Sequence, residues 1–283
     1  MTVGPGRPGL IVANGSLRTA DLPQRVPAAR AAGFDGIGVH VRDYARLRAD
    51  GWTGAGLRSL LRDSGFDLVE IETVLGWDDP PERRDPDGRN REQWAFALAD
   101  AVGARHVVAV GALSGALRET ATEGFAGLCD RAAEHGLLVA LEPQACSTVA
   151  DLDTALTIVR DAGRPNGGLN LDVWHRTRGG WPLADLRALA ADEIVVVQLD
   201  DGPTVPVTAD YLEECTHHRT APGAGEFDLL GFLAAVRATG TRAPVSVEVL
   251  SDEFDRLPVE QVAERLATAT RAVLSASRRA GAS

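Results

Sequence analysis

One pattern limits the fold of this chain more than any other feature: a helical stretch ends in glycine, and a short apolar strand follows within a few residues. The pattern occurs six times, with the closing glycines at Gly33, Gly65, Gly103, Gly136, Gly163 and Gly240. Glycine adopts the left-handed conformation that ends a helix without the steric cost that other residues bear. Regular alternation of helix and strand predicts a parallel sheet, because each helix carries the chain back to the edge where the next strand begins.

Two more apolar runs bring the number of predicted strands to eight. The predicted strands are residues 10–13, 36–40, 68–72, 106–110, 137–142, 168–172, 194–199 and 244–248, and the last helix is expected at 257–276. Eight such units in about 250 residues are typical of a (β/α)₈ barrel. A doubly wound sheet is the alternative, but it usually has a Gly-rich turn after its first strand, and residues 12–16 contain one glycine. We therefore predict an α/β fold, a single TIM-barrel domain over 1–283.

Two insertions are expected at the end of the barrel where the strands finish. Residues 78–91 are charged and rich in Pro and Gly, which indicates a solvated loop, with a mobile lid as the alternative. Residues 201–227, after the seventh strand, form the longest insertion. Loops at this end border the active site in barrels of this kind.

Composition excludes several classes of partner. The 40 acidic residues outnumber the 29 Lys and Arg, which gives a net charge of −11, and no basic run is present, so nucleic acid is not expected as a partner. No apolar run approaches the length of a membrane span, and residues 1–8 do not resemble a signal peptide, so a cytoplasmic protein is expected. Three widely spaced cysteines indicate neither a zinc ribbon nor a disulfide framework.

Four oxygen-bearing side chains end the last four predicted strands: Glu142, Asp172, Gln198 and Glu248. The strand ends of a barrel form its active site, and burial of an isolated carboxylate is costly unless a cation compensates it. Three carboxylates and an amide oxygen suit Mg²⁺ or Mn²⁺, with Co²⁺ as a further candidate. Each acidic residue taken singly could instead be a helix cap, and Gln198 could be satisfied within the core.

These residues and their surroundings resemble the sugar phosphate isomerase/epimerase superfamily of xylose isomerase-like barrels. The motifs that carry the resemblance are Leu141–Pro143 (LEP), Asp172–His175 (DVWH), Gln198–Asp200 (QLD), Arg219–Asp228 (RTAPGAGEFD) and Val247–Glu248 (VE). The resemblance covers most of the chain, from Leu10 to about Ala276. It implies that Glu142, Asp172, Gln198 and Glu248 bind one divalent metal ion.

The resemblance also implies an isomerase or epimerase that acts on a keto sugar or a cyclitol. In that chemistry Glu142, Glu248 or His175 would remove the proton next to a carbonyl and leave a metal-bound enediolate. Gln198 departs from ketose 3-epimerases, which commonly have His there, and is similar to hydroxypyruvate isomerase-like and 3-dehydroshikimate dehydratase-like branches. A dehydratase of the inosose or 3-dehydroshikimate type is therefore the alternative, because loss of a β-hydroxyl begins with the same proton abstraction.

Five further residues are candidates for substrate contact. His175 follows Asp172 by three residues in what is expected to be a loop, and would act on a substrate oxygen or as a base; a structural cap is its alternative. His40 and Glu72 end the second and third strands, where substrate contact and structural hydrogen bonding are both open. The Arg219 fork could hold a polyol or a carboxylate, and the Trp174 ring could stack on a sugar or pack in the core.

Two other classes of function remain open at this point. One is a metal-dependent hydrolase or nuclease, although the nuclease branch of the superfamily uses more histidines than this chain offers. The other is a non-catalytic sugar-binding protein, which the retention of Glu142 and Glu248 disfavours. The expected partner is a small polyhydroxylated carbonyl compound, and a homo-oligomer is an open alternative to a monomer.

Overall fold

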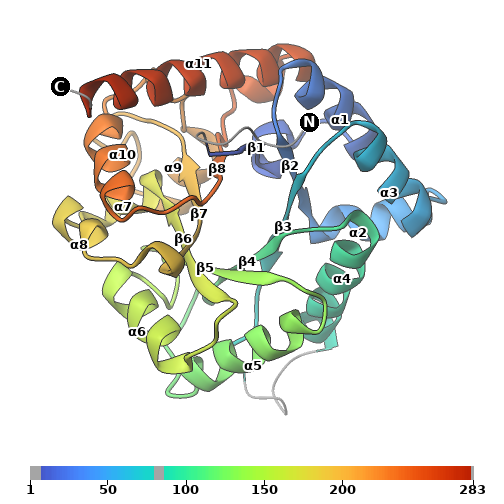
Figure 1. Cartoon of the computed structure of the whole chain (residues 1–283), viewed down its shortest axis with the longest axis horizontal. Helices are drawn as coiled ribbons and strands as arrows, with labels where there is room; N and C mark the ends of the chain where they lie inside the picture. Colours follow the sequence, from blue (N-terminus) through green and yellow to red (C-terminus); the bar gives the residue numbers. More distant parts are fainter. Residues whose placement is uncertain (1–7, 80–85, 282–283) are drawn as a thin grey trace.

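The computed structural model describes residues 8–79 and 86–281, and its centre is a closed barrel of eight parallel strands in sequence order, which excludes the doubly wound alternative (Figure 1). The strands are β1 Leu10–Val12, β2 Gly36–His40, β3 Leu68–Val74, β4 His106–Val110, β5 Leu138–Glu142, β6 Gly167–Asp172, β7 Ile194–Leu199 and β8 Val245–Val247. The ring closes because β1 pairs with both β2 and β8. The predicted strands are thus confirmed, with ends that differ by two residues at most.

Helices surround the barrel, and the last helix lies beside the first (Figure 1). They are α1 Leu22–Ala31, α2 Val41–Ala49, α3 Gly54–Asp63, α4 Pro86–Val102, α5 Ala121–Ala133, α6 Leu152–Ala162, α7 Val173–Gly179, α8 Leu183–Arg187, α9 Tyr211–His217, α10 Leu229–Ala238 and α11 Val259–Ala280, with 3₁₀ turns at Asn14–Leu17, Ala191–Glu193 and Phe254–Arg256. All six glycines that were expected to close a helix have positive φ angles. These glycines therefore adopt the left-handed conformation at the ends of their helices, as the sequence pattern predicted.

Three predicted loops differ in the structure. Helix α4 already begins at Pro86, so the loop expected at 78–91 is shorter; residues 80–85 lie outside the described residues. Proline suits the first turn of a helix, where its missing N–H has no partner in any case, so its presence did not mark a loop. The insertion at 201–227 contains α9, and His175 lies on α7 instead of in a loop.

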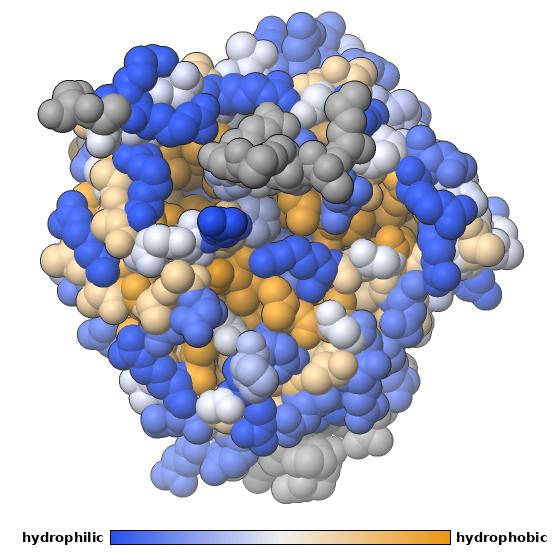
Figure 2. Space-filling model, viewed as in Figure 1, coloured by the Kyte–Doolittle hydropathy of each residue, from blue (hydrophilic) through white to orange (hydrophobic). Residues whose placement is uncertain are grey.

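The apolar core lies mainly between the barrel and its helices, while the barrel interior mixes apolar and polar side chains. Ala140, Val195 and Val196 form a small apolar layer inside. In the face shown in Figure 2, hydrophilic residues dominate the periphery and hydrophobic residues appear toward the centre. Among residues 8–79 and 86–281, no helix has both the length and the apolar character needed to cross a membrane.

Candidate active site

Glu142 and Asp172 end two neighbouring strands, and their side chains converge with that of His175. The three offer ligand atoms that all lie within 4.8 Å of one another, and all three residues are buried. Oε2 of Glu142 accepts a hydrogen bond from Gln144, at 2.6 Å, whereas Oε1 has no hydrogen-bond partner among the described residues. Burial raises the pKa of Glu142 well above its usual range, and the nearby Glu248 and Asp172 raise it further. Such a group gains from a nearby positive charge.

His175 reaches this cluster because a helix begins directly at the end of β6. Oδ1 of Asp172 accepts a hydrogen bond from the Trp174 backbone N–H at 2.7 Å and so caps α7. One turn later, Nε2 of His175 lies 3.5 Å from Oδ2 of Asp172 and 3.7 Å from Oε1 of Glu142. Burial lowers the pKa of the imidazole to about 4, so the ring is neutral at physiological pH. Asp172 thus serves both as a cap and as a member of the cluster.

Arg219 provides the positive charge closest to these carboxylates. Its Nη1 donates to Oδ2 of Asp172 at 3.0 Å and to Oε2 of Glu248 at 3.3 Å, and it pairs more closely with Asp200. Its Nε donates to the carbonyl oxygen of Cys215, which fixes the guanidinium. The structure thus brings Arg219 to the site with its Nη1 directed at the carboxylates. Contact between Arg219 and the substrate stays a prediction. Three carboxyl groups contact this guanidinium, and the carboxyl group of Glu142 lies near enough to feel its charge. Four carboxyl groups beside one positive charge favour the binding of a further cation.

Gln198 and Glu248 complete the predicted set of oxygen donors. Gln198 lies opposite Asp172 in the β6–β7 pairing, and its Oε1 accepts a hydrogen bond from Nδ2 of Asn170 at 2.6 Å. An amide oxygen has two lone pairs, so this contact leaves one for another partner. Glu248 lies one residue beyond β8, and burial raises its pKa to about 7 despite the opposing effect of Arg219. The four strand ends therefore do meet at one end of the barrel, while their role as ligands stays a prediction.

Glu72 and His40 lie at the same end of the barrel, on β3 and β2. Oε1 of Glu72 accepts a hydrogen bond from the backbone N–H of Asn14 at 2.8 Å. Gly38 makes room for this carboxyl group, because a Cβ atom at position 38 would lie 2.2 Å from Oε1. Nδ1 of His40 accepts from the backbone N–H of Arg42 at 3.0 Å, so His40 caps α2. Both residues have structural hydrogen bonds, and substrate contact by either stays a prediction.

Trp174 is fully buried, and other side chains lie over its ring. Arg178 lies 4.6 Å and Arg219 5.3 Å from the ring centroid, and Phe227 packs at 5.5 Å. These contacts support the expected alternative of core packing. A stacking contact between Trp174 and a sugar would require these neighbours to move.

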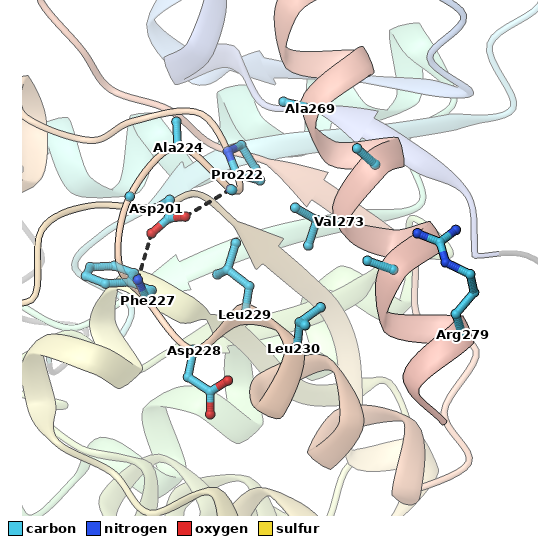
Figure 3. Close-up of a pocket in the computed structure, with 14 residues that line it drawn as sticks. Asp201, Pro222, Ala224, Phe227, Asp228, Leu229, Leu230, Ala269, Val273 and Arg279 are labelled. Carbon is cyan, nitrogen blue, oxygen red and sulfur yellow. Dashed lines mark hydrogen bonds between the residues drawn. The ribbon is translucent and has the colours of Figure 1, made fainter. Parts of the chain in front are cut away.

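A hollow of about 770 Å³ lies elsewhere, between residues 222–230 and α11 (Figure 3). The carboxylate of Asp201 accepts hydrogen bonds from the backbone N–H groups of Gly223 and Phe227, both at 2.9 Å, and holds the loop in place. Neighbouring acidic residues thus differ in role, since Asp200 faces Arg219 and Asp201 orders the loop. The carboxylate cluster, and not this hollow, carries the concentration of titratable groups.

The chain matches a known protein family. A family model described as xylose isomerase-like TIM barrel matches residues 26–273. The chain belongs to the xylose isomerase-like TIM barrel family. The resemblance inferred from the motifs at the strand ends is thereby confirmed.

Relatives within this family include enzymes of two kinds. A 3-dehydroshikimate dehydratase of Pseudomonas aeruginosa is 34% identical over 243 residues, which cover 84% of this chain and 37% of the relative. A second 3-dehydroshikimate dehydratase, from Pseudomonas putida, is 29% identical over 85% of this chain and 38% of its own length. This chain thus spans less than two fifths of both. An inosose isomerase of Bacillus velezensis is 24% identical over 92% of this chain and 94% of the relative.

Solved structures of the family have the same architecture. A fusion protein of a xylose isomerase-like TIM barrel and a 4-hydroxyphenylpyruvate dioxygenase superposes with a TM-score of 0.87 at 26% identity, over 96% of this chain and 43% of that chain. An IolI protein with a bound zinc atom superposes with a TM-score of 0.85 at 20% identity, over 95% of this chain and 99% of that chain. At 20% identity, the similarity to the IolI protein shows a shared fold.

Sequence reasoning did not assign a role to two residues of the site. Asp200 follows Gln198 by two positions, so the alternation of side chains along a strand could have placed both on one face. Tyr211, whose hydroxyl lies 2.6 Å from Nδ1 of His175, is in the long insertion, where no periodic signal marks it. Only the folded chain brings Tyr211 to the site.

Proposed function

We propose that this chain is a metal-dependent lyase that dehydrates a cyclic hydroxyketone of the 3-dehydroshikimate type. The observation that carries the proposal is the buried cluster of Glu142, Asp172 and His175, with one oxygen and one nitrogen that lack hydrogen-bond partners among the described residues. The two relatives named 3-dehydroshikimate dehydratase support the outcome of the reaction. Gln198 is compatible with the proposal, because it resembles the residue of the 3-dehydroshikimate dehydratase-like branch as well as that of the hydroxypyruvate isomerase-like branch.

The donor set fits a divalent cation. Glu142, Asp172, Gln198 and Glu248 would hold it with oxygen atoms, and His175 would lie beside it with its Nε2–H directed at the substrate. Oxygen-rich sites of this kind suit Mn²⁺ or Mg²⁺, with Co²⁺ as a further candidate. When bound, such a cation polarises a carbonyl group and makes the neighbouring C–H more acidic.

Glu248, Glu142 and His175 have the chemistry that the proton transfers require. The pKa of Glu248 is about 7, so this carboxyl group exchanges protons near neutrality, as a general base requires. Glu248 or Glu142 would take the proton from the carbon next to the carbonyl. His175 would then hydrogen-bond to the hydroxyl group on the β carbon. This hydroxyl would leave as water with the proton that the carboxyl group had taken from the α carbon. Burial of the cluster keeps bulk water from competing for these contacts.

Isomerisation of an inosose-type ketone is the second candidate, and the relative from Bacillus velezensis supports it because it aligns over almost its whole length. Both reactions begin with the same proton abstraction and differ in the second step. Return of the proton to another carbon gives the isomer, whereas expulsion of the β-hydroxyl gives the alkene.

Incubation of the Mn²⁺-loaded protein in D₂O with 3-dehydroshikimate or with an inosose separates the two candidates. Dehydration is expected to give an aromatic product with rising ultraviolet absorbance, and isomerisation would give deuterium on carbon without that rise. Glu142→Gln should lower turnover by about 10²–10⁴-fold, the range for one acid–base group. Glu226→Gln is the matched control, because its carboxylate is exposed and, among the described residues, accepts hydrogen bonds from Thr204 alone. Wild-type turnover in Glu142→Gln would contradict the assignment of the site.

A further inference from the structure

We propose that Tyr211 is a positioning residue that fixes the ring orientation and the tautomer of His175, an inference that rests on the proposed role of His175 in catalysis. Tyr211 opens α9 in the insertion after β7, and His175 lies on α7. The phenol oxygen lies 2.6 Å from Nδ1 of His175, and the two rings are inclined by 18° with their centroids 6.0 Å apart. The opposite nitrogen, Nε2, faces the carboxylates.

A second contact holds the two helices in the same relation. Glu214 is three residues after Tyr211 on α9, and Arg178 is three residues after His175 on α7. Nη2 and Nε of Arg178 donate to the Glu214 carboxylate at 2.8 and 2.9 Å, and both side chains are buried. Residues three apart on a helix lie on one face. The two helices therefore meet through two neighbouring residue pairs, one of Tyr211 with His175 and one of Glu214 with Arg178. The phenol is therefore held against the imidazole by packing as well as by its own hydrogen bond.

The surroundings of the imidazole favour one direction for that hydrogen bond. Burial raises the pKa of the Tyr211 phenol, so the hydroxyl stays protonated and is able to donate. On the other side of the ring, Nε2 lies 3.5 Å from Oδ2 of Asp172 and 3.7 Å from Oε1 of Glu142, and these oxygens are acceptors for a proton on Nε2. Nδ1 then accepts from the phenol, and His175 presents an N–H group toward the substrate. The alternative tautomer would have Nδ1 donate to the phenol and would leave Nε2 as an acceptor.

The test uses Tyr211→Phe, which keeps the ring and removes the hydroxyl. Tyr44→Phe is the matched control, because Tyr44 is the other tyrosine of the chain and lies on α2. We expect Tyr211→Phe to lower kcat about 10- to 100-fold with KM changed less than about twofold, the range for a residue that orients a functional histidine. In the background of His175→Gln, Tyr211→Phe should have no further effect on kcat. An equal loss in both backgrounds would overturn the proposal, since it would indicate a general structural role.

A spectroscopic measurement separates this inference from the proposed function. ¹⁵N NMR of labelled histidine, with His175→Gln to assign the signal, reports the tautomer of His175 without any substrate. Wild-type protein and Tyr44→Phe should show a proton on Nε2, and Tyr211→Phe should show a mixture. A proton on Nδ1 in the wild type, or the same signal in Tyr211→Phe, would overturn the inference. If the expected shift appears while no ketone is turned over, the positioning role stands and the proposed function fails.

Discussion

At the scale of single residues, the site depends on how closely buried carboxyl groups approach the backbone. Oε1 of Glu72 accepts from the N–H of Asn14, and Gly38 on the neighbouring strand β2 is the residue that leaves space for it. The absence of a side chain at position 38 therefore serves the site and not a turn.

Gly38→Ala should destabilise the protein. Its Cβ would lie 2.2 Å from Oε1 of Glu72 and 2.6 Å from the backbone nitrogen of Asn14, so one of these groups must move. Overpacking of this kind costs about 1–3 kcal/mol of unfolding free energy. Gly54→Ala is the control, because its nearest neighbour is a methyl carbon at 3.4 Å. Urea unfolding compares the two variants, and equal unfolding free energies would show that position 38 has more room than the structure indicates.

Glu72 should make stability depend on pH. Burial raises its pKa well above 4.5, and Glu70 and Glu248 raise it further. A carboxyl group with a higher pKa in the folded chain stabilises the fold below the unfolded value of 4.5 and loses that contribution as the pH rises. The unfolding free energy of chelator-treated protein should therefore fall as the pH rises above 4.5, and that of Glu72→Gln should fall less steeply because its amide does not ionise. Urea unfolding at several pH values measures this slope, with Glu226→Gln as control. A slope in Glu72→Gln as steep as in the wild type would assign the dependence to other groups.

At the scale of elements, the contact between α7 and α9 connects the insertion after β7 to the site. Arg178 is the centre of this contact: it pairs with Glu214, lies over Trp174 and donates to the carbonyl oxygen of Pro203. The insertion is thus ordered by a buried ion pair, and it carries Tyr211 to His175.

The Arg178–Glu214 pair should show strong coupling. Arg178→Met or Glu214→Met alone leaves one buried charge without its partner, which costs about 3–5 kcal/mol. The double variant removes both charges and should be destabilised by less than the sum of the two single changes. A double-mutant cycle of unfolding free energies by urea measures the difference. Strict additivity would mean that the pair contributes nothing beyond its separate contacts.

At the scale of the whole molecule, the barrel brings negative charge together from strands that are far apart in the chain. Glu142, Asp172, Asp200 and Glu248 lie around one arginine at the end of the barrel, and Glu70 lies inside it, with Oε2 at 3.2 Å from Nε2 of His106. Repulsion within this group opposes folding, so a cation that binds there should stabilise the whole chain.

Mn²⁺ or Mg²⁺ should therefore raise the melting temperature, and a chelator should reverse the rise. At a free concentration of 100 times Kd, one bound ion adds about 2.7 kcal/mol of unfolding free energy. Glu142→Gln should respond less than the wild type because it lacks one of the charges, while Glu226→Gln should respond fully. Differential scanning calorimetry with and without the metal measures this effect. A melting temperature that ignores both ions and the chelator would contradict the proposed cation site.

The barrel, and the side chains at the ends of its last four strands, could be predicted from the sequence. Six glycines mark helix ends, and apolar runs between them mark strands, because both signals arise from local backbone preferences that tertiary packing did not override. Glu142, Asp172, Gln198 and Glu248 could be selected because parallel strands of a barrel all finish at the same end. The exceptions, the start of α4 at Pro86 and the helical position of His175, are local boundaries at which proline and a capping aspartate permit a helix.

The partners of these side chains, in contrast, could be read only from the folded chain. Arg219 lies 47 positions from Asp172 and Tyr211 lies 36 from His175, and no periodic pattern connects residues so far apart. The same holds for His106 and Glu70, whose pairing depends on the register of β3 against β4. Partners of this kind follow from which atoms meet in a buried space, where each polar group must find a hydrogen bond, and a linear pattern of residue types does not contain that information.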